Sequence, residues 1–107
     1  MLLEVTNSNF DELRNSGKPL VLDFWAEWCG PCRMVSPLLE SLAEQFAGEV
    51  VIGKLNVDEG ENDSIVQKYL IRNIPTLLFF KDGELVDRFV GSAQRSVYES
   101  KIKALLN

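Results

Sequence analysis

The sequence predicts an α/β fold in which a mixed β-sheet is flanked by helices on both faces. Over the first two thirds of the chain, strand-like apolar runs alternate with segments of helical spacing, which favours parallel strands joined by helices. Near the end, two strand-like runs flank Asp82-Gly83, a dipeptide that favours an antiparallel hairpin. The expected element order is therefore β-α-β-α-β-α-β-β-α. A length of 107 residues fits a single domain over residues 1–107.

The N-terminal part is predicted to hold a strand, a helix and a second strand. Residues 2–5 are the short first strand, and apolar residues three apart behind Asn7 and Ser8 indicate a short capped helix. Residues 20–26 are an almost continuous apolar run, as expected of a strand that is buried on both faces. Asp23 interrupts this run. Most aspartates face solvent, but the apolar neighbours on both sides predict that Asp23 is buried.

The remaining elements follow from the same two periodicities. The predicted helices cover residues 32–47, the segment around 65–70 and the C-terminal tail, and the predicted strands cover residues 50–57, 76–80 and 85–90. Pro37 lies within the first of these helices and predicts a kink there.

Composition and charge exclude several classes of protein. The net charge is −5 and the basic residues are scattered, so no nucleic-acid partner is expected. The longest apolar runs, such as residues 77–80, are too short to cross a membrane. The N-terminus lacks a basic segment followed by an apolar stretch, so it does not resemble a secretory signal. We expect a cytoplasmic protein, or one of an organellar matrix or stroma if a presequence has been removed.

Cys29 and Cys32 are the residues with the most informative spacing. Two such cysteines can close a disulfide or share a metal, but zinc takes four ligands, and the chain has no histidine and no third cysteine. We therefore expect no metal site within one chain. Inert buried thiols, or metal carried between two chains, remain as alternatives. At this spacing beside a βαβ pattern, a redox-active pair is the usual function.

The position of the pair along the chain supports redox chemistry. It follows a predicted buried strand and opens a predicted helix, so Cys29 is expected at the helix N-terminus. Free N–H groups and the helix dipole favour a thiolate at that place, and the thiolate is the species that attacks disulfides. Cys29 is therefore predicted to be the exposed nucleophile. Cys32, one turn along, is predicted to be more buried and to attack the mixed disulfide.

These residues belong to a longer segment with a strong resemblance to a known family. The segment Phe24-Trp25-Ala26-Glu27-Trp28-Cys29-Gly30-Pro31-Cys32-Arg33-Met34 resembles the active site of bacterial-type thioredoxins. The likeness continues through residues 54–58 and 71–76 and includes Gly83 and Gly91. It implies the thioredoxin fold and a protein-disulfide reductase, which works by dithiol exchange through a mixed disulfide on Cys29 resolved by Cys32.

The resemblance also implies roles for other residues. Asp23 and Lys54 would form a buried charged pair beneath the cysteines and take part in catalysis, although a lysine in a strand is as often a solvated edge charge. Gly30 and Pro31 would tune the redox potential. The surface that receives client proteins would be formed by Trp28, Ile74, Pro75 and Gly91. Pro75 would be cis, although most X–Pro bonds are trans.

Partners and alternatives follow from the same resemblance. Such a protein is a monomer without a bound cofactor, its redox group being the Cys29–Cys32 disulfide. It is re-reduced by a thioredoxin reductase, which is either an NADPH flavoprotein or ferredoxin-dependent. The same motif could serve an oxidase or isomerase, or the fold could act as a scaffold independent of redox state. The chain departs from the family at Leu70, where thioredoxins usually have glycine, and at Asn73 and Ser92.

Overall fold

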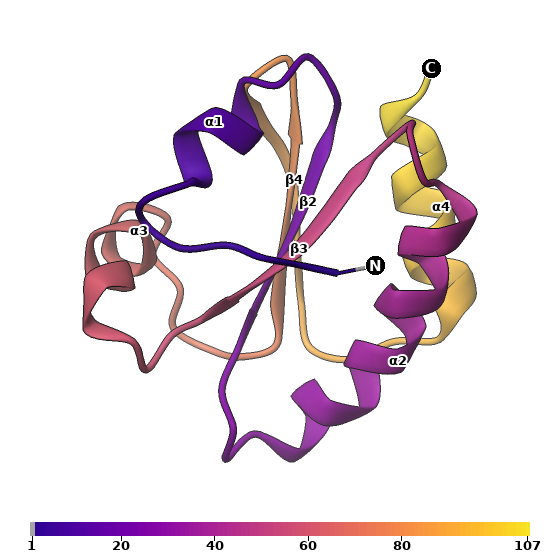
Figure 1. Ribbon diagram of the computed structural model, residues 1–107. Helices are drawn as coiled ribbons and strands as arrows, with labels where there is room; N and C mark the ends of the chain where they lie inside the picture. Colours follow the sequence, from indigo (N-terminus) through magenta and orange to yellow (C-terminus); the bar gives the residue numbers. More distant parts are fainter. Residues whose placement is uncertain (1) are drawn as a thin grey trace.

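The structure is a computed structural model that describes residues 2–107, and it consists of one sheet covered by helices on both faces. The helices α1 (Phe10–Arg14) and α3 (Asp63–Lys68) cover one face, and α2 (Gly30–Gln45) and α4 (Arg95–Leu105) cover the other (Figure 1). This arrangement confirms the predicted fold class. The described residues add one short 3₁₀ turn, Gly60–Asn62, to the predicted order.

Four strands of the sheet have one end each on the same side of the molecule. Its strands are β1 (Leu3–Glu4), β2 (Leu20–Trp25), β3 (Val51–Asn56), β4 (Thr76–Lys81) and β5 (Glu84–Val90), in the spatial order β1-β3-β2-β4-β5. The first three strands are parallel, and β4 is antiparallel to both β2 and β5. Consequently the C-terminal ends of β2, β3 and β5 lie beside the N-terminal end of β4, on the lower side of the sheet in Figure 1.

The hairpin between β4 and β5 has the turn that its sequence predicts. Asp82 and Gly83 both have left-handed backbone angles, with φ of 53° and 81°. Two such residues in succession give a turn whose twist matches that of the strands it joins. The ladder between these strands has a register shift at Phe79 and Phe80.

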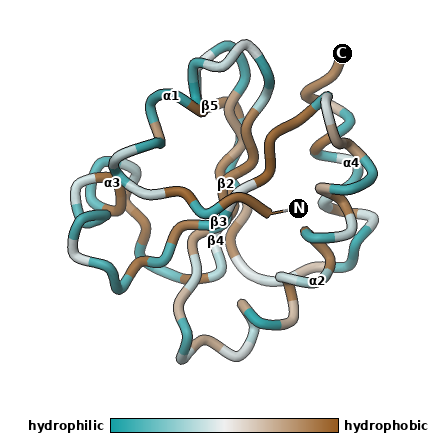
Figure 2. The backbone as a smooth tube through the Cα atoms, in the orientation of Figure 1, coloured by the Kyte–Doolittle hydropathy of each residue, from teal (hydrophilic) through white to brown (hydrophobic). Residues whose placement is uncertain are grey.

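The core consists of two apolar layers, one on each face of the sheet. Residues on the face covered by α2 and α4 include Val21, Leu39, Ile52, Phe79 and Tyr98. Residues on the opposite face include Phe10, Leu22, Phe24, Leu78 and Phe80. Because side chains alternate along a strand, β2 and β4 supply both layers, which explains their almost continuous apolar runs; Figure 2 colours the chain by hydropathy.

Some predicted boundaries need correction. The helix predicted over residues 32–47 begins at Gly30 and ends at Gln45, with Pro37 inside it. The cap of α1 is Asn9 rather than Asn7 or Ser8. Its side chain makes no bond to the helix N-terminus, because its Oδ1 instead accepts a hydrogen bond from the backbone N–H of Thr6 at 2.8 Å.

Candidate active site

The two cysteines form a disulfide at the N-terminus of α2, on the side of the sheet where β2, β3 and β5 end. The sulfurs are 2.17 Å apart and the Cα atoms 5.3 Å apart. Cys29 is the N-cap of α2, and its Sγ accepts a hydrogen bond from the backbone N–H of Cys32 at 3.2 Å. Pro31 lies in the first turn, where its fixed φ suits a helix start and its missing N–H costs no hydrogen bond. The local sequence therefore directs the backbone N–H of Cys32 at the Cys29 sulfur.

Both cysteines are buried in this disulfide form. Cys29 is 4% exposed and Cys32 is 2% exposed. They cluster with Ala26, and the partly buried side chains of Trp25, Val57 and Ile74 pack against that cluster. The expectation that Cys29 is exposed is wrong for the oxidised state, because these neighbours cover its sulfur. Cys32 is only slightly more buried than Cys29.

The segment around Pro75 lies against the disulfide. The Ile74–Pro75 peptide bond is cis, as predicted. The carbonyl oxygen of Ile74 is 3.8 Å from Cys29 Sγ. The carbonyl oxygen of Pro75 accepts a hydrogen bond from the backbone N–H of Gly91 at 2.8 Å. Gly91 has a φ of 97°, a left-handed angle that glycine adopts readily. The loops after β2, before β4 and after β5 thus meet at one place.

Trp28 projects from this place into solvent. Its side chain is 69% exposed, yet its Nε1–H donates a hydrogen bond to Asp58 Oδ2 at 2.8 Å. Trp28 and Ile74 also line a shallow groove of about 190 Å³, together with Val57, Val66, Ile71 and Arg72. Sequence reasoning missed Asp58 as an anchor of the indole. The available signal was its position two residues after β3, a strand that ends on the same side of the sheet as β2.

Asp23 is a buried carboxylic acid. It lies two residues after Val21 in β2, so its side chain is on the same face of the sheet, the face that α2 and α4 cover. It is 1% exposed, and its Oδ1 has no hydrogen-bond partner among residues 2–107. Burial raises the pKa of Asp23 to about 7, while the positive charge of Lys54 opposes this rise. The burial predicted from the apolar run is confirmed.

Lys54 does not form the expected buried charged pair. It lies opposite Asp23 in the register of β2 and β3, but the described part of the chain shows no ion pair between them within 4.0 Å. Lys54 is only half-buried, and its Nζ is 4.7 Å from the centroid of the Trp25 ring. The aromatic face attracts the cation while the ammonium group keeps contact with water. Its influence on Asp23 is therefore a longer-range electrostatic one.

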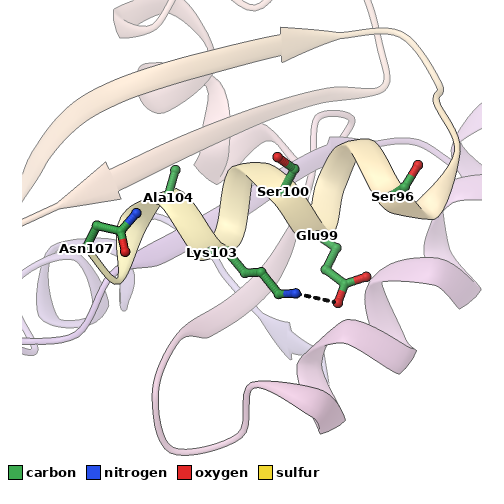
Figure 3. Close-up of a pocket in the computed structure, with 6 residues that line it drawn as sticks. All are labelled: Ser96, Glu99, Ser100, Lys103, Ala104 and Asn107. Atoms are coloured by element: carbon green, nitrogen blue, oxygen red, sulfur yellow. Dashed lines mark ion pairs between the residues drawn. The ribbon is translucent and has the colours of Figure 1, made fainter.

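A second hollow lies away from the cysteines, on α4. It is lined by Ser96, Glu99, Ser100, Lys103, Ala104 and Asn107 (Figure 3). Lys103 Nζ and Glu99 Oε2 form an ion pair across it at 3.3 Å. All of its side chains come from this helix and the chain end beyond it, and none is a cysteine. This hollow is therefore not the redox site.

Within residues 2–107 no cluster of three or more cysteine, aspartate or glutamate side chains is suited to hold a metal ion. The same stretch has no helix that combines the length and apolar character needed to cross a membrane.

A disulfide between cysteines separated by two residues, at the N-terminus of a helix that packs on a mixed five-stranded sheet, defines a class of thiol–disulfide oxidoreductases. A family model described as thioredoxin matches residues 1–104. With this match and the relatives below, the chain belongs to the thioredoxin family. It is accordingly a thiol–disulfide oxidoreductase whose redox group is its own Cys29–Cys32 disulfide.

Three of the similar relatives are two bacterial thioredoxins and one chloroplastic thioredoxin. A thioredoxin of Staphylococcus haemolyticus is 54% identical over 90 residues, which cover 84% of each chain. A thioredoxin of Chlorobaculum thiosulfatiphilum is 46% identical over 100 residues, or 92% of this chain and 91% of the relative. A chloroplastic M-type thioredoxin of Pisum sativum is 45% identical over 100 residues, or 92% of this chain and 57% of the pea chain.

Proposed function

We propose that the chain reduces disulfides of client proteins by dithiol exchange. The thiolate of reduced Cys29 attacks one client sulfur, which forms a mixed disulfide and releases the other client sulfur as a thiolate. The thiolate of Cys32 then attacks Cys29 Sγ, which frees the second client sulfur and leaves the Cys29–Cys32 disulfide. The observation that carries this proposal is the hydrogen bond from Cys32 N–H to Cys29 Sγ at the start of α2. The same donor, with the helix dipole, favours a thiolate at Cys29.

Asp23 is proposed as the base for the second step. The thiol of Cys32 must lose its proton before it attacks the mixed disulfide. A carboxylate accepts this proton most effectively when its pKa is close to the working pH, and the pKa of Asp23 is about 7. Lys54 acts on this step indirectly, because its charge limits the rise in the pKa of Asp23.

The surface around the disulfide is proposed to receive the client. Trp28, Ile74, Pro75 and Gly91 form this client surface. Its support is the meeting of three loops at Cys29 and the shallow apolar groove beside Trp28 and Ile74. Between the cysteines, Gly30 and Pro31 are proposed to set the redox potential, since they fix the start of the helix that holds the Cys29 sulfur.

The partners and setting are proposed from the family. The oxidised chain is returned to the dithiol by a thioredoxin reductase, which uses NADPH or ferredoxin as the source of electrons. We propose a monomer with a single domain, residues 1–107, that works in the cytoplasm or in an organellar matrix or stroma. Neither nucleic acid nor a membrane is a partner in this proposal.

Trapping of the mixed disulfide tests the order of the two thiols. Cys32→Ser cannot resolve the intermediate, so it is expected to accumulate a covalent complex with a disulfide client such as insulin. Cys29→Ser lacks the nucleophile and is expected to trap none. Non-reducing gel electrophoresis with peptide mapping identifies the linked cysteine. A complex formed through Cys32 in the Cys29→Ser variant would reverse the assignment.

The direction of the reaction is tested by redox titration against glutathione. A reducing thioredoxin has a potential of about −270 mV, and a strongly oxidising relative has one of about −120 mV. A potential near the second value would show that the chain works as an oxidase and would overturn the proposal.

A further inference from the structure

The phenol of Tyr98 ends inside the molecule, against the loop that joins β5 to α4. Tyr98 is fully buried, and its ring packs edge-to-face on Phe89 with the centroids 5.8 Å apart. A buried hydroxyl needs hydrogen-bond partners, and both partners here are backbone atoms of the loop. The N–H of Ala93 donates to Tyr98 Oη at 2.9 Å, and Tyr98 Oη donates to the Gly91 carbonyl oxygen at 3.5 Å. The hydroxyl therefore joins the buried face of α4 to this loop.

Besides the bonds to Tyr98, few hydrogen bonds hold the backbone of the loop between β5 and α4. β5 ends at Val90 and α4 begins at Arg95. Gln94 is the N-cap of α4, but its side chain makes no capping hydrogen bond. Helix N-termini leave N–H groups that need outside partners. Tyr98 does not cap the helix, but its hydroxyl bonds to Ala93, the residue before the N-cap, and so holds the loop where it enters α4.

Hydrogen bonds continue from this loop to the redox site. The N–H of Gly91 donates to the Pro75 carbonyl oxygen at 2.8 Å, and the carbonyl oxygen of neighbouring Ile74 is 3.8 Å from Cys29 Sγ. Gly91, Pro75 and Ile74 belong to the client surface defined above. The Tyr98 hydroxyl is therefore two hydrogen bonds away from the segment that lies against the disulfide.

Resting on the proposed function, we propose that Tyr98 is a positioning residue for client binding. Its hydroxyl holds the Gly91 loop in place and keeps the client surface formed before a client arrives. A preformed surface binds more tightly because the loop need not be ordered during binding. The hydroxyl makes no contact with either sulfur among the described residues. Its effect is therefore expected on client affinity, because the hydroxyl forms no hydrogen bond with the sulfurs or with Asp23 among the described residues.

Tyr98→Phe tests this inference, because it keeps the ring on Phe89 and removes only the hydroxyl. The variant loses both hydrogen bonds to the loop, and an effect the size of one typical net hydrogen bond is expected to raise KM for insulin about fivefold, with kcat changed by less than about twofold. Reduction of the small disulfide 5,5′-dithiobis(2-nitrobenzoate), which needs no docking surface, is expected to stay unchanged. Hydrogen exchange should accelerate at the Ala93 amide, while protected amides in the middle of α4 show that the fold is intact.

Tyr69→Phe is the matched control. Tyr69 also packs edge-to-face in an aromatic cluster, with Phe10 and Phe80, but it is the C-cap of α3. Among residues 2–107 none of its hydrogen bonds or ring contacts reaches the Gly91 loop. The same loss of a hydroxyl is expected to leave KM for insulin and the Ala93 amide exchange as in the wild type.

Two outcomes would overturn the inference. If Tyr98→Phe frees the Ala93 amide but KM for insulin does not change, the loop does not govern client binding. If insulin and the small disulfide lose rate equally, the hydroxyl acts on the sulfurs instead. A wild-type chain that has been reduced with dithiothreitol and separated from the excess reagent, and that then reduces neither disulfide, would refute the proposed function itself, and the inference would fall with it.

Discussion

At the scale of single residues, Asp23 combines a cost in stability with a role in chemistry. A carboxylic acid without a partner for Oδ1 in an apolar layer is less stable when it is charged. Its native pKa of about 7 exceeds the ordinary aspartate value of about 3.9, so the folded chain keeps a proton that the unfolded chain has released. The contribution of Asp23 to stability therefore falls as pH rises from about 4 to about 7, and it levels off above that.

Asp23→Asn is expected to remove this pH dependence. A native pKa of about 7 corresponds to a loss of about 4 kcal/mol between the two limits. The amide has nearly the same volume and does not ionise, so the variant should gain on the wild type as pH rises from 5 to 8. Urea denaturation across this range measures the difference, in which the other ionisable groups cancel. A constant difference at every pH would contradict the assignment of the raised pKa to Asp23.

At the scale of elements, the end of α3 shows what Leu70 costs at a position where the family usually has glycine. Leu70 has a φ of 55° and is 63% exposed. The N–H of Leu70 donates to Gln67 O at 3.1 Å, and the N–H of Ile71 donates to Val66 O at 3.0 Å. These two bonds form a Schellman motif, whose left-handed position is usually glycine. A leucine there costs about 1–2 kcal/mol in backbone strain.

Leu70→Gly is expected to stabilise the chain by about 1 kcal/mol, because relief of the strain outweighs the greater freedom of glycine in the unfolded state. For a chain of this size the melting temperature should rise by about 4 °C. Leu70→Ala is the matched control: it keeps the Cβ atom and the strain, and since the side chain is mostly exposed it should change little. Thermal melts of the three proteins measure both effects. Equal gains for glycine and alanine would show that the leucine side chain, rather than the φ angle, is the cause.

At the scale of the whole molecule, the two apolar layers share one sheet. Leu39 of α2 lies in one layer and Leu78 of β4 in the other, and both are fully buried. Because β2 and β4 supply side chains to both layers, neither layer can be lost while the other keeps its strands. The molecule is therefore expected to unfold as one cooperative unit.

Leu39→Ala and Leu78→Ala test this expectation from opposite faces. Each is expected to cost about 2–5 kcal/mol, through lost burial and the cavity left behind. Far-UV circular dichroism and tryptophan fluorescence should report the same shifted transition in each variant. Separate transitions for the two signals in either variant would mean that one layer melts alone.

The sequence predicted most of the fold because the patterns involved are local. The apolar run of residues 20–26 and the Asp82-Gly83 dipeptide need no knowledge of distant partners. The function of the cysteine pair could be predicted equally well, because its spacing and its place at the start of a helix are set by a few neighbouring residues. The contact of Trp28 with Asp58, thirty residues away, was not predicted, because the place of Asp58 after a neighbouring strand indicates proximity but not a hydrogen bond. Neither was the position of Lys54 over Trp25, because it depends on how two neighbouring strands pack.

The two edges of the sheet bear on how copies of the molecule behave when crowded. β1 has only two residues, and β5 carries Asp87 and Arg88 on its exposed length, with Asp87 paired to Lys101 at 2.8 Å. A short edge offers few free backbone groups, and a charged, irregular edge beside a register shift is a poor template for another strand. Addition of one molecule to another through strand pairing is therefore disfavoured at both sides. Concentrated solutions of the folded chain should resist the growth of fibrils from these edges.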